Sequence, residues 1–413
     1  MSRRSRRLPE LSLDGWLLFV TCAVRSFAYG FLSVVLGLYL AAIGLDAVAI
    51  GIVFTAALAG GAVMTVFLTT VADQYGRRRV LIIGAALMAL AGAVFALTDS
   101  LAMLSVAAVL GTISPSGKEV GPFLSVEQAV LPQTTSDRQR TSVFAAYNLV
   151  GSLAGALGAL AVTLPPFLGI APLAGYRLLI WGYVAAALLM VVLFARLSPA
   201  LEAAKRVGAS ARPPYGVHRS RAAVMKLSAL FAIDAFAGGF VVQSLVAYWF
   251  YLRYGVDSRS LGAIFFGTNF LSALSFLFAA PLARRIGLLN TMVFTHLSSN
   301  VLLLMVPFMP SLELAVGVFL ARHLLSQLDV PTRQSYTMAI IDPDERSAAA
   351  GLMSVARTGA AAVAPAFTGW LLAAPALGMP FLLAGGLKIV YDLWIFALFR
   401  HVRPPEEVIR DRS

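Results

Sequence analysis

Four charged residues stand close together between two long apolar runs of this chain. They are Asp73, Arg77, Arg78 and Arg79, within the stretch from Thr69 to Leu81. Charges are costly inside hydrocarbon, so this stretch is predicted to be a short loop at a membrane surface, with Gly76 turning the chain. Basic loops between spans mark the cytoplasmic side, and this assignment sets the direction of every other segment.

The composition indicates a helical membrane protein with many spans. Of the 413 residues, 59% are hydrophobic and only 13% are charged, whereas ordinary soluble domains carry about 25% charged residues. At about 20 apolar residues per spanning helix, the length accommodates about twelve spans. They are predicted near 13–41, 47–72, 78–98, 101–131, 138–164, 175–197, 223–252, 258–281, 288–309, 312–340, 346–373 and 379–400.

The distribution of basic residues orients the chain. Most of the 32 lysines and arginines fall in termini and loops on the side of Arg77, whereas only Arg177, Arg253 and Arg259 fall in loops on the other side. The positive-inside bias then places both termini in the cytoplasm and the protein in the cell (inner or plasma) membrane. Topology explains the net charge of +12, so nucleic-acid binding is not expected.

The two halves of the chain repeat each other. The heptapeptide that begins at Arg25 aligns with the one that begins at Asp234, and Gln128 and Arg140 are spaced like Gln334 and Arg346. The duplication predicts a six-helix bundle at 1–197, a cytoplasmic linker at 198–222 and a second six-helix bundle at 223–413. The linker is interpreted as flexible or surface-lying, with polybasic binding of membrane lipids as the alternative. Repeats of this size are typical of transporter folds.

These features together resemble a known family. Duplicated six-span halves, a basic central connector and the signature Asp-x-x-Gly-Arg-Arg-Arg at 73–79 are similar to the major facilitator superfamily. The resemblance covers nearly the whole chain and implies an all-α membrane protein of twelve transmembrane helices in two pseudo-symmetric bundles. Thr69 and Gln74 depart from the family pattern, which usually has Gly and a cation at these places.

The resemblance also implies a conformational latch around Gly76. Asp73 would face the start of span eleven near Arg346, where the helix dipole favours a carboxylate. Arg77 would meet Glu127 at the inner end of span four. Together these contacts would hold the halves closed while the site faces outward. The alternative is that the cations only enforce topology.

Charges inside the predicted spans are the candidate site residues, because such charges usually face a cavity or a partner. Arg25 and Asp234 occupy equivalent places in spans one and seven, which the resemblance puts around a central cavity. They are expected to pair or exchange partners there. A carboxylate in that position could couple to protons; a fixed structural ion pair is the alternative.

Span four contains the strongest helix-breaking pattern. Two prolines and two glycines between Pro115 and Pro122 are predicted to interrupt the helical hydrogen bonds. Irregular backbone at membrane depth is tolerated where it lines a cavity or is packed in protein. Lys118 and Glu119 lie beside this break, where they could serve binding or gating, or could pair with other spans.

Span ten contributes Arg322 and His323. His323 could titrate near neutral pH or could be a packing histidine. Two acid–base pairs spaced four apart are interpreted as neutralising each other on one helix face: Asp329 with Arg333, and Lys388 with Asp392. No metal or other cofactor is expected, because no second histidine is spaced to build a site with His323.

The sequence therefore predicts a secondary active transporter that works by alternating access on a small organic solute. Proton-coupled efflux is the favoured subtype, supported by the in-span carboxylates and by Gly151, Gly155 and Gly158, which resemble a weakened antiporter motif. Uptake or facilitated transport of a polar metabolite, such as a sugar or organic anion, is one alternative. A non-transporting receptor or scaffold is another. An enzyme is not expected, and the protein is expected to be a monomer.

Overall fold

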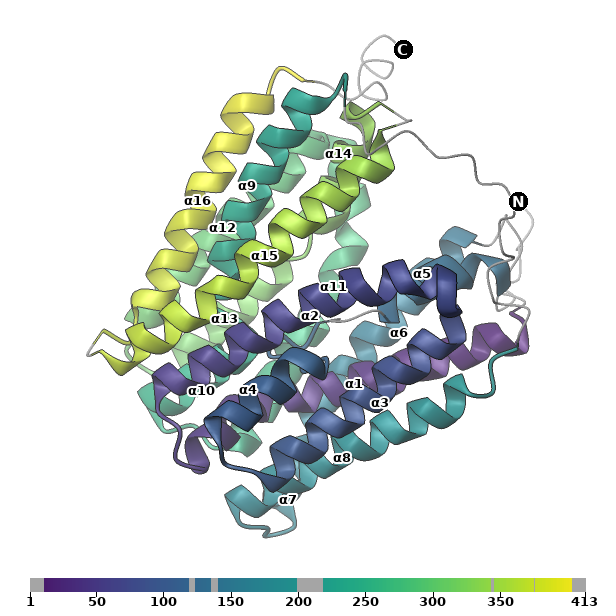
Figure 1. The fold of residues 1–413 in the computed structure, drawn as a ribbon. Coiled ribbons are helices and arrows are strands. Elements are labelled where there is room, and N and C mark those ends of the chain that lie inside the picture. The colour runs from purple at the N-terminus through teal and green to yellow at the C-terminus, as the bar shows by residue number, and fades with distance from the viewer. Residues whose placement is uncertain are drawn as a thin grey trace, which may run out of the picture.

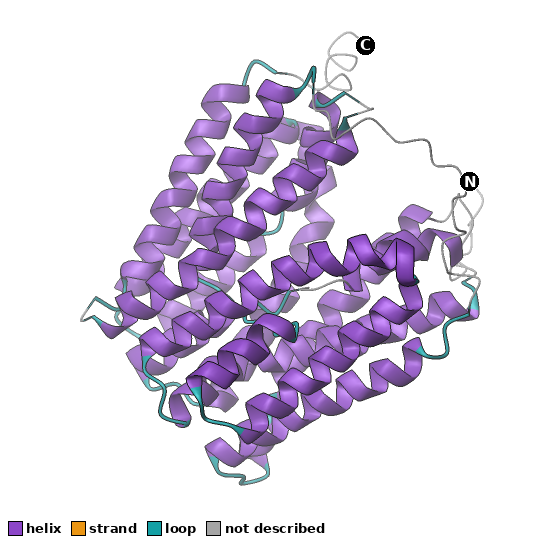
Figure 2. Ribbon diagram, viewed as in Figure 1, coloured by secondary structure: helices purple, strands orange, loops and turns teal. Residues whose placement is uncertain are grey.

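The computed structural model describes residues 11–118, 123–134, 140–198, 218–342, 345–374 and 376–402. Within these ranges every regular element is helical (Figure 2). The first half comprises α1 (Leu13–Ala42), α2 (Ala47–Tyr75), α3 (Arg77–Leu97), α4 (Leu101–Leu110), α5 (Phe123–Val130), η1 (Leu131–Thr134), α6 (Arg140–Ala161), α7 (Leu164–Phe167) and α8 (Pro172–Phe194). The second half comprises α9 (Arg221–Gly239), α10 (Gln243–Tyr254), α11 (Ser258–Ile286), α12 (Leu288–Met305), η3 (Val306–Phe308), α13 (Leu312–Leu325), α14 (Asp329–Ile340), α15 (Arg346–Ala373) and α16 (Met379–Phe399).

The two halves form two helical bundles, as predicted. Figure 1 shows them close together at one end, the far end, and diverging towards the other, the termini end, where α1 begins and α16 ends. Nine segments within the described ranges are long and apolar enough to cross a membrane. The predicted twelve crossings are recovered when α4 with α5, α9 with α10 and α13 with α14 are each taken as one interrupted path. Residues 199–217, which make up most of the predicted linker at 198–222, lie outside the described residues.

The predicted loop between spans two and three is wrong in its length. Helix α2 continues to Tyr75 and α3 begins at Arg77, so Gly76 alone connects them. Gly76 has φ 101°, a conformation that side chains with a Cβ rarely adopt. The second half has the same single-glycine connection at Gly287, which joins α11 to α12 with φ 89°.

Span four breaks where the sequence predicts. Helix α4 ends at Leu110, residues 111–118 are not helical, and helix resumes at Phe123. Span ten also breaks, which the sequence analysis missed: α13 ends at Leu325 and α14 begins at Asp329. Pro331 lies in the first turn of α14, where its missing N–H is tolerated, and its lack of an i−4 hydrogen bond to the preceding turn favours the second break.

Close helix approaches join the halves at the far end. A Cβ built on Gly51 of α2 would lie 2.5 Å from the Pro365 carbonyl oxygen of α15, and one on Gly369 would lie 2.3 Å from the Ala47 oxygen. Between α1 and α10, the Ser244 hydroxyl donates to the Ser33 oxygen at 2.7 Å. Towards the termini end, Tyr75 of α2 is 64% exposed and Val355 of α15 is 59% exposed. The close contacts described here between the halves therefore lie towards the far end.

At the termini end of each half, a carboxylate accepts hydrogen bonds from residues next to a helix end. In the first half, Asp14 accepts from the Ser198 N–H at 2.9 Å and from its hydroxyl at 2.7 Å. In the second, Glu345 accepts from the backbone N–H groups of His218, Arg219 and Ser220 at 2.6, 2.8 and 2.9 Å. Burial raises the pKa of Glu345, but these hydrogen bonds outweigh it and lower that pKa to about 2.

Candidate functional site

The first half contains one deeply buried ion pair. Arg25 of α1 donates to Glu127 of α5 through two nitrogens, at 2.9 and 2.7 Å, and both side chains are 0% exposed. The Tyr147 hydroxyl also donates to Glu127. The Arg25 guanidinium lies over the Phe123 ring at 4.8 Å from its centroid. A buried, two-pronged pair with this much support has the character of a fixed structural contact.

This geometry corrects one expected pairing. Arg25 is bound within its own half by Glu127, and Asp234 is bound within its own half by Lys388. The direct contact between Arg25 and Asp234 across the halves is therefore not observed in the described part of the chain. Glu127 accepts from Arg25 through both carboxylate oxygens, and its expected contact with Arg77 while the site faces outward stays a prediction.

The second half centres on Asp234, in the last two turns of α9 and near the middle of the interrupted path formed by α9 and α10. Its carboxylate is 6% exposed and is shared by cations from three other helices. Lys388 of α16 lies 2.5 Å from Oδ1, whereas Arg333 of α14 and Arg357 of α15 lie 3.2 and 3.7 Å from Oδ2. One carboxylate therefore holds together helices from four separate parts of the sequence. Electrostatic attraction between these groups is strong because little water screens them.

His296 of α12 links Asp234 to a second carboxylate. Its Nδ1 lies 2.7 Å from Asp392 Oδ1, and its Nε2 lies 3.7 Å from Asp234 Oδ1. Asn300, one turn along α12, donates to Asp392 Oδ2 at 2.9 Å. A neutral imidazole carries one N–H and can donate to one of these carboxylates, whereas a protonated ring can donate to both. This arrangement can hold an exchangeable proton.

The sequence analysis missed His296 and Asn300. His296, Ser299 and Asn300 are spaced so that they share one face of an otherwise apolar helix. This polar face is the sequence pattern that could have identified them as site residues. The interpretation of Lys388 and Asp392 as a self-neutralising pair is wrong, because Lys388 contacts Asp234 and Asp392 contacts His296. The pairing of Asp329 with Arg333 is confirmed, at 3.3 Å.

The remaining predicted site residues lie near this cluster or outside the description. Lys118 is exposed and lies in the segment that contacts the second half, where the Ser244 N–H of α10 donates to the Pro115 oxygen at 3.0 Å. The His323 ring is bonded locally: Nδ1 donates to the Phe319 oxygen at 2.8 Å, and Arg322 lies 3.4 Å from Nε2. Glu119 lies outside the described residues.

The predicted latch residues all lie towards the termini end, but their contacts are only partly described. Asp73 is in the last turns of α2, and its side chain is outside the described part. Arg77 begins α3 and is half-buried. Arg346 begins α15, is exposed, and donates through Nε to the Ile341 oxygen at 3.3 Å. Arg78, the next residue of α3, donates to the Ala195 carbonyl at the end of α8.

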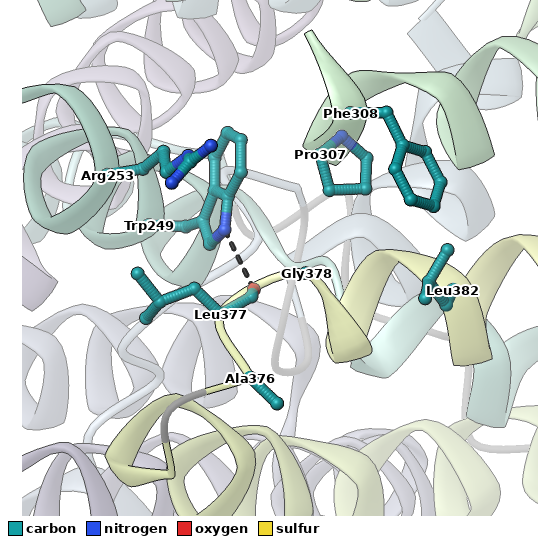
Figure 3. A pocket seen from close by; sticks show the side chains of 8 residues that line it. All are labelled: Trp249, Arg253, Pro307, Phe308, Ala376, Leu377, Gly378 and Leu382. Atoms are coloured by element: carbon teal, nitrogen blue, oxygen red, sulfur yellow. Dashed lines mark hydrogen bonds between the residues drawn. The ribbon is translucent and has the colours of Figure 1, made fainter. Parts of the chain in front are cut away.

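A separate pocket of about 290 Å³ lies at the far end, away from the charged residues described above (Figure 3). Trp249 of α10 forms one wall, and its indole N–H donates to the Leu377 oxygen at 2.8 Å. Pro307, Phe308 and Leu382 supply mostly apolar surface opposite it. In the described residues, no group of three His, Cys, Asp or Glu side chains is arranged to hold a metal ion.

Comparisons with known proteins agree with the architecture. A family model described as Major Facilitator Superfamily matches residues 18–326. The Uncharacterized membrane protein YJR124C of Saccharomyces cerevisiae is 30% identical over 423 residues, covering 94% of this chain and 94% of that protein. The nucleoside transporter NupG is 14% identical, with a TM-score of 0.74 over 94% of this chain and 100% of its own. A D-xylose-proton symporter is 14% identical, with a TM-score of 0.70 over 95% and 98%.

Proposed function

The chain belongs to the Major Facilitator Superfamily, and on that premise we propose that it is a secondary active transporter that couples the movement of a small organic solute to protons. Alternating access between the two bundles is the mechanism. The coupling proposal rests on one observation, the sharing of the buried Asp234 carboxylate among Lys388, Arg333 and Arg357.

Protonation of Asp234 would change the forces between four helices. The carboxylate supplies the negative charge that holds cations from α14, α15 and α16 against α9. A proton removes that charge and leaves the cations facing one another, so their arrangement becomes unfavourable. Two packings of the second half then differ in proton affinity, and proton binding biases the equilibrium between them. His296 supplies a route for the proton between Asp234 and Asp392.

The basic residues support a cytoplasmic assignment for the termini end. On that assignment, the structure is the inward-facing member of the transport cycle, with the halves packed at the far end through Gly51 and Gly369. Asp73 and Arg77 would engage the second half when the termini end closes.

Export in exchange for protons is the proposed direction. In this state the Asp234 carboxylate is engaged by cations while the halves diverge towards the cytoplasmic side, which is the arrangement from which an exporter loads its solute. The glycine pattern of α6 adds nothing to this argument. Gly30 of α1 packs against Gly155 of α6, and a Cβ added to Gly30 would lie 2.1 Å from the Gly155 oxygen. Close packing of α1 against α6 therefore explains the glycine pattern.

The test is proton flux in liposomes that contain the purified protein and an internal pH-sensitive dye. A panel of organic cations, sugars and organic anions is added under pH gradients of either sign, and the sign that drives flux gives the direction. Asp234→Asn should abolish proton-coupled flux while leaving solute binding measurable. The matched control is Asp99→Asn, because Asp99 is 58% exposed and pairs with Arg177 at 3.6 Å, far from the cluster.

Two results would count against the proposal. Unchanged proton flux in Asp234→Asn would remove this carboxylate from the coupling role. If no solute in the panel moves under any imposed gradient, a receptor or scaffold becomes the better description.

A further inference from the structure

Cations exceed anions among the described charged residues that face the junction of the two halves. Lys388 and Arg333 have short carboxylate contacts, with Asp234 and with both Asp234 and Asp329 respectively. Asp392 is occupied by His296 and Asn300. The buried pair of Arg25 and Glu127 is neutral by itself. Three cations remain without a short ion pair in the described part of the chain: Lys118, Arg322 and Arg357.

Lys118 is held in place by the non-helical segment of span four. The Ser114 hydroxyl donates to the Lys118 carbonyl at 2.6 Å, and the Lys118 N–H donates to the Ser116 hydroxyl at 3.3 Å. This segment is in turn docked on the second half, because the Ser244 N–H donates to the Pro115 oxygen at 3.0 Å. The backbone around Lys118 is thus fixed while its side chain stays exposed. An exposed ammonium on a fixed backbone, facing other cations, suits an incoming anion.

Arg357 presents part of its guanidinium to solvent. Its side chain is 33% exposed, and its one described carboxylate contact is long, with NH1 3.7 Å from Asp234 Oδ2. Its guanidinium also lies 5.8 Å from the centre of the Phe231 ring, which helps to fix its plane. A guanidinium has five N–H donors in a planar fork that matches carboxylate and phosphate oxygens.

Arg322 provides an independent indication of a ligand. Within the described part of the chain its buried Nε has no hydrogen-bond partner, and its NH1 lies 3.4 Å from Nε2 of His323. A buried donor without an acceptor costs free energy that a bound acceptor would recover. Arg322 also interacts electrostatically with Lys118 across the junction. Like charges that face one another repel, and an anion between them converts the repulsion to attraction.

We infer that the transported solute is an organic anion whose carboxylate or phosphate group is held between Lys118 of the first half and Arg322 and Arg357 of the second half. This inference rests on the proposed transport function and adds the class of solute. It also gives the solute a mechanical role, because an anion contacting cations from both halves joins the halves across the junction. Neutral solutes of the same shape lack that attraction.

The experiment compares matched anionic and neutral compounds by thermal unfolding of the purified full-length protein. Glucose 6-phosphate is paired with glucose for the phosphate arm, and benzoate with benzyl alcohol for the carboxylate arm. Potassium chloride at equal ionic strength controls for screening. The anionic member of at least one pair should raise Tm by roughly 2 °C or more at saturation, and its neutral partner should not.

Substitutions locate the effect. Lys118→Gln and Arg357→Gln should each weaken binding of the responding anion by roughly tenfold or more, the loss expected for one charged hydrogen bond. Lys226→Gln and Arg259→Gln are the matched controls, because both side chains are exposed away from this cluster, and the anion should bind them as it binds the parent.

Three outcomes would overturn the inference: no anion raises Tm, the neutral partner raises it equally, or Lys118→Gln and Arg357→Gln keep the parent affinity. None of these depends on the coupling proposal. A transporter of neutral solutes would show no anion-specific rise in Tm, and it would still show Asp234-dependent proton flux in liposomes.

Discussion

Individual buried charges in this protein differ in what they do, and the difference lies in their partners. Arg25 has one carboxylate, Glu127, which it grips with two nitrogens in a fully buried setting. Asp234 is shared among three cations, Lys388, Arg333 and Arg357. A pair with matched partners is stable in one arrangement, whereas a carboxylate shared among cations is stable in several. The first is therefore structural, and the second is suited to change during transport.

For the structural pair, we predict a large loss of stability on removing one partner. Arg25→Met should lower the free energy of unfolding by about 3–5 kcal/mol, because Glu127 is left buried without its cation. Arg25→Met combined with Glu127→Leu should recover most of this loss, since no charge remains to be buried. Unfolding in mixed detergent micelles measures both variants. Equal stability of the single and double variants would show that the pair is dispensable.

For the shared carboxylate, we predict that His296 connects Asp234 to Asp392. The ring is faced by Asp392 and Tyr391 of α16 and by Asp234 of α9, beside Lys388 and Asn300. His296→Gln keeps a donor for Asp392 but cannot relay a proton between the two carboxylates, so proton-coupled flux in liposomes should fall by roughly tenfold or more. His401→Gln, an exposed position just beyond α16, should keep the parent flux. Parent-like flux in His296→Gln would assign proton transfer elsewhere.

The sequence identified Arg25 and Asp234 as exceptional residues but assigned them the wrong partners. A charge within an apolar run is visible in the sequence, because its burial is costly wherever the helix packs. The partner depends on which helices become neighbours and on their rotation. Glu127 lies 102 positions from Arg25, and Lys388 lies 154 positions from Asp234, so neither contact follows from local spacing. Only Asp329 and Arg333, four apart on one helix, could be paired from spacing.

At the scale of helices, breaks in two spans position the polar groups. The break after Leu110 was predictable, since prolines and glycines crowd the following residues. The break before Asp329 was not predicted, because Pro331 stands alone in a sequence that otherwise reads as one helix. Both breaks free the ends of short helices within the span. Lys118 and Asp329 lie directly at these breaks, so interruption of the helix and placement of charge have the same cause.

Helix ends give a second prediction, which concerns Glu345. Its folded-state pKa, about 2, is lower than the ordinary value of 4.5, so the ionised form favours folding. The resulting stability is present above about pH 4.5 and is lost as the pH falls through about 2. Glu345→Gln should therefore lower Tm at pH 6 and flatten the dependence of Tm on pH between about 4.5 and 2. Parallel curves for the parent and Glu345→Gln would contradict the assigned hydrogen bonds.

At the scale of the whole molecule, the glycines of α2 and α15 decide how closely the far end can pack. Gly369→Ala would place a Cβ 2.3 Å from the Ala47 oxygen, so the far end must open and the population should shift towards closure at the termini end. Gly359→Ala on the same helix is the matched control, because nothing lies within 4 Å of its added Cβ.

Distances between spin labels at Tyr75→Cys and Leu352→Cys would measure this shift. Both positions are exposed near the termini ends of α2 and α15, and Cys22 is buried, so a Cys22→Ala background leaves only the two labels. The label distance should shorten in Gly369→Ala and should stay at the parent value in Gly359→Ala. An equal distance in all three proteins would mean that the far-end glycines do not limit the transport cycle.

The single-residue junctions at Gly76 and Gly287 allow almost no slack between the helices they connect. Helix α2 faces the other half at α15 and α11 faces it at α6, whereas their joined partners α3 and α12 carry large apolar side chains on their outer surfaces, among them Leu90 and Phe294. A displacement at the interface must therefore be carried to the bilayer-facing wall of the same half. The thickness and lateral pressure of the surrounding bilayer then become thermodynamic inputs to the cycle, alongside solute and proton.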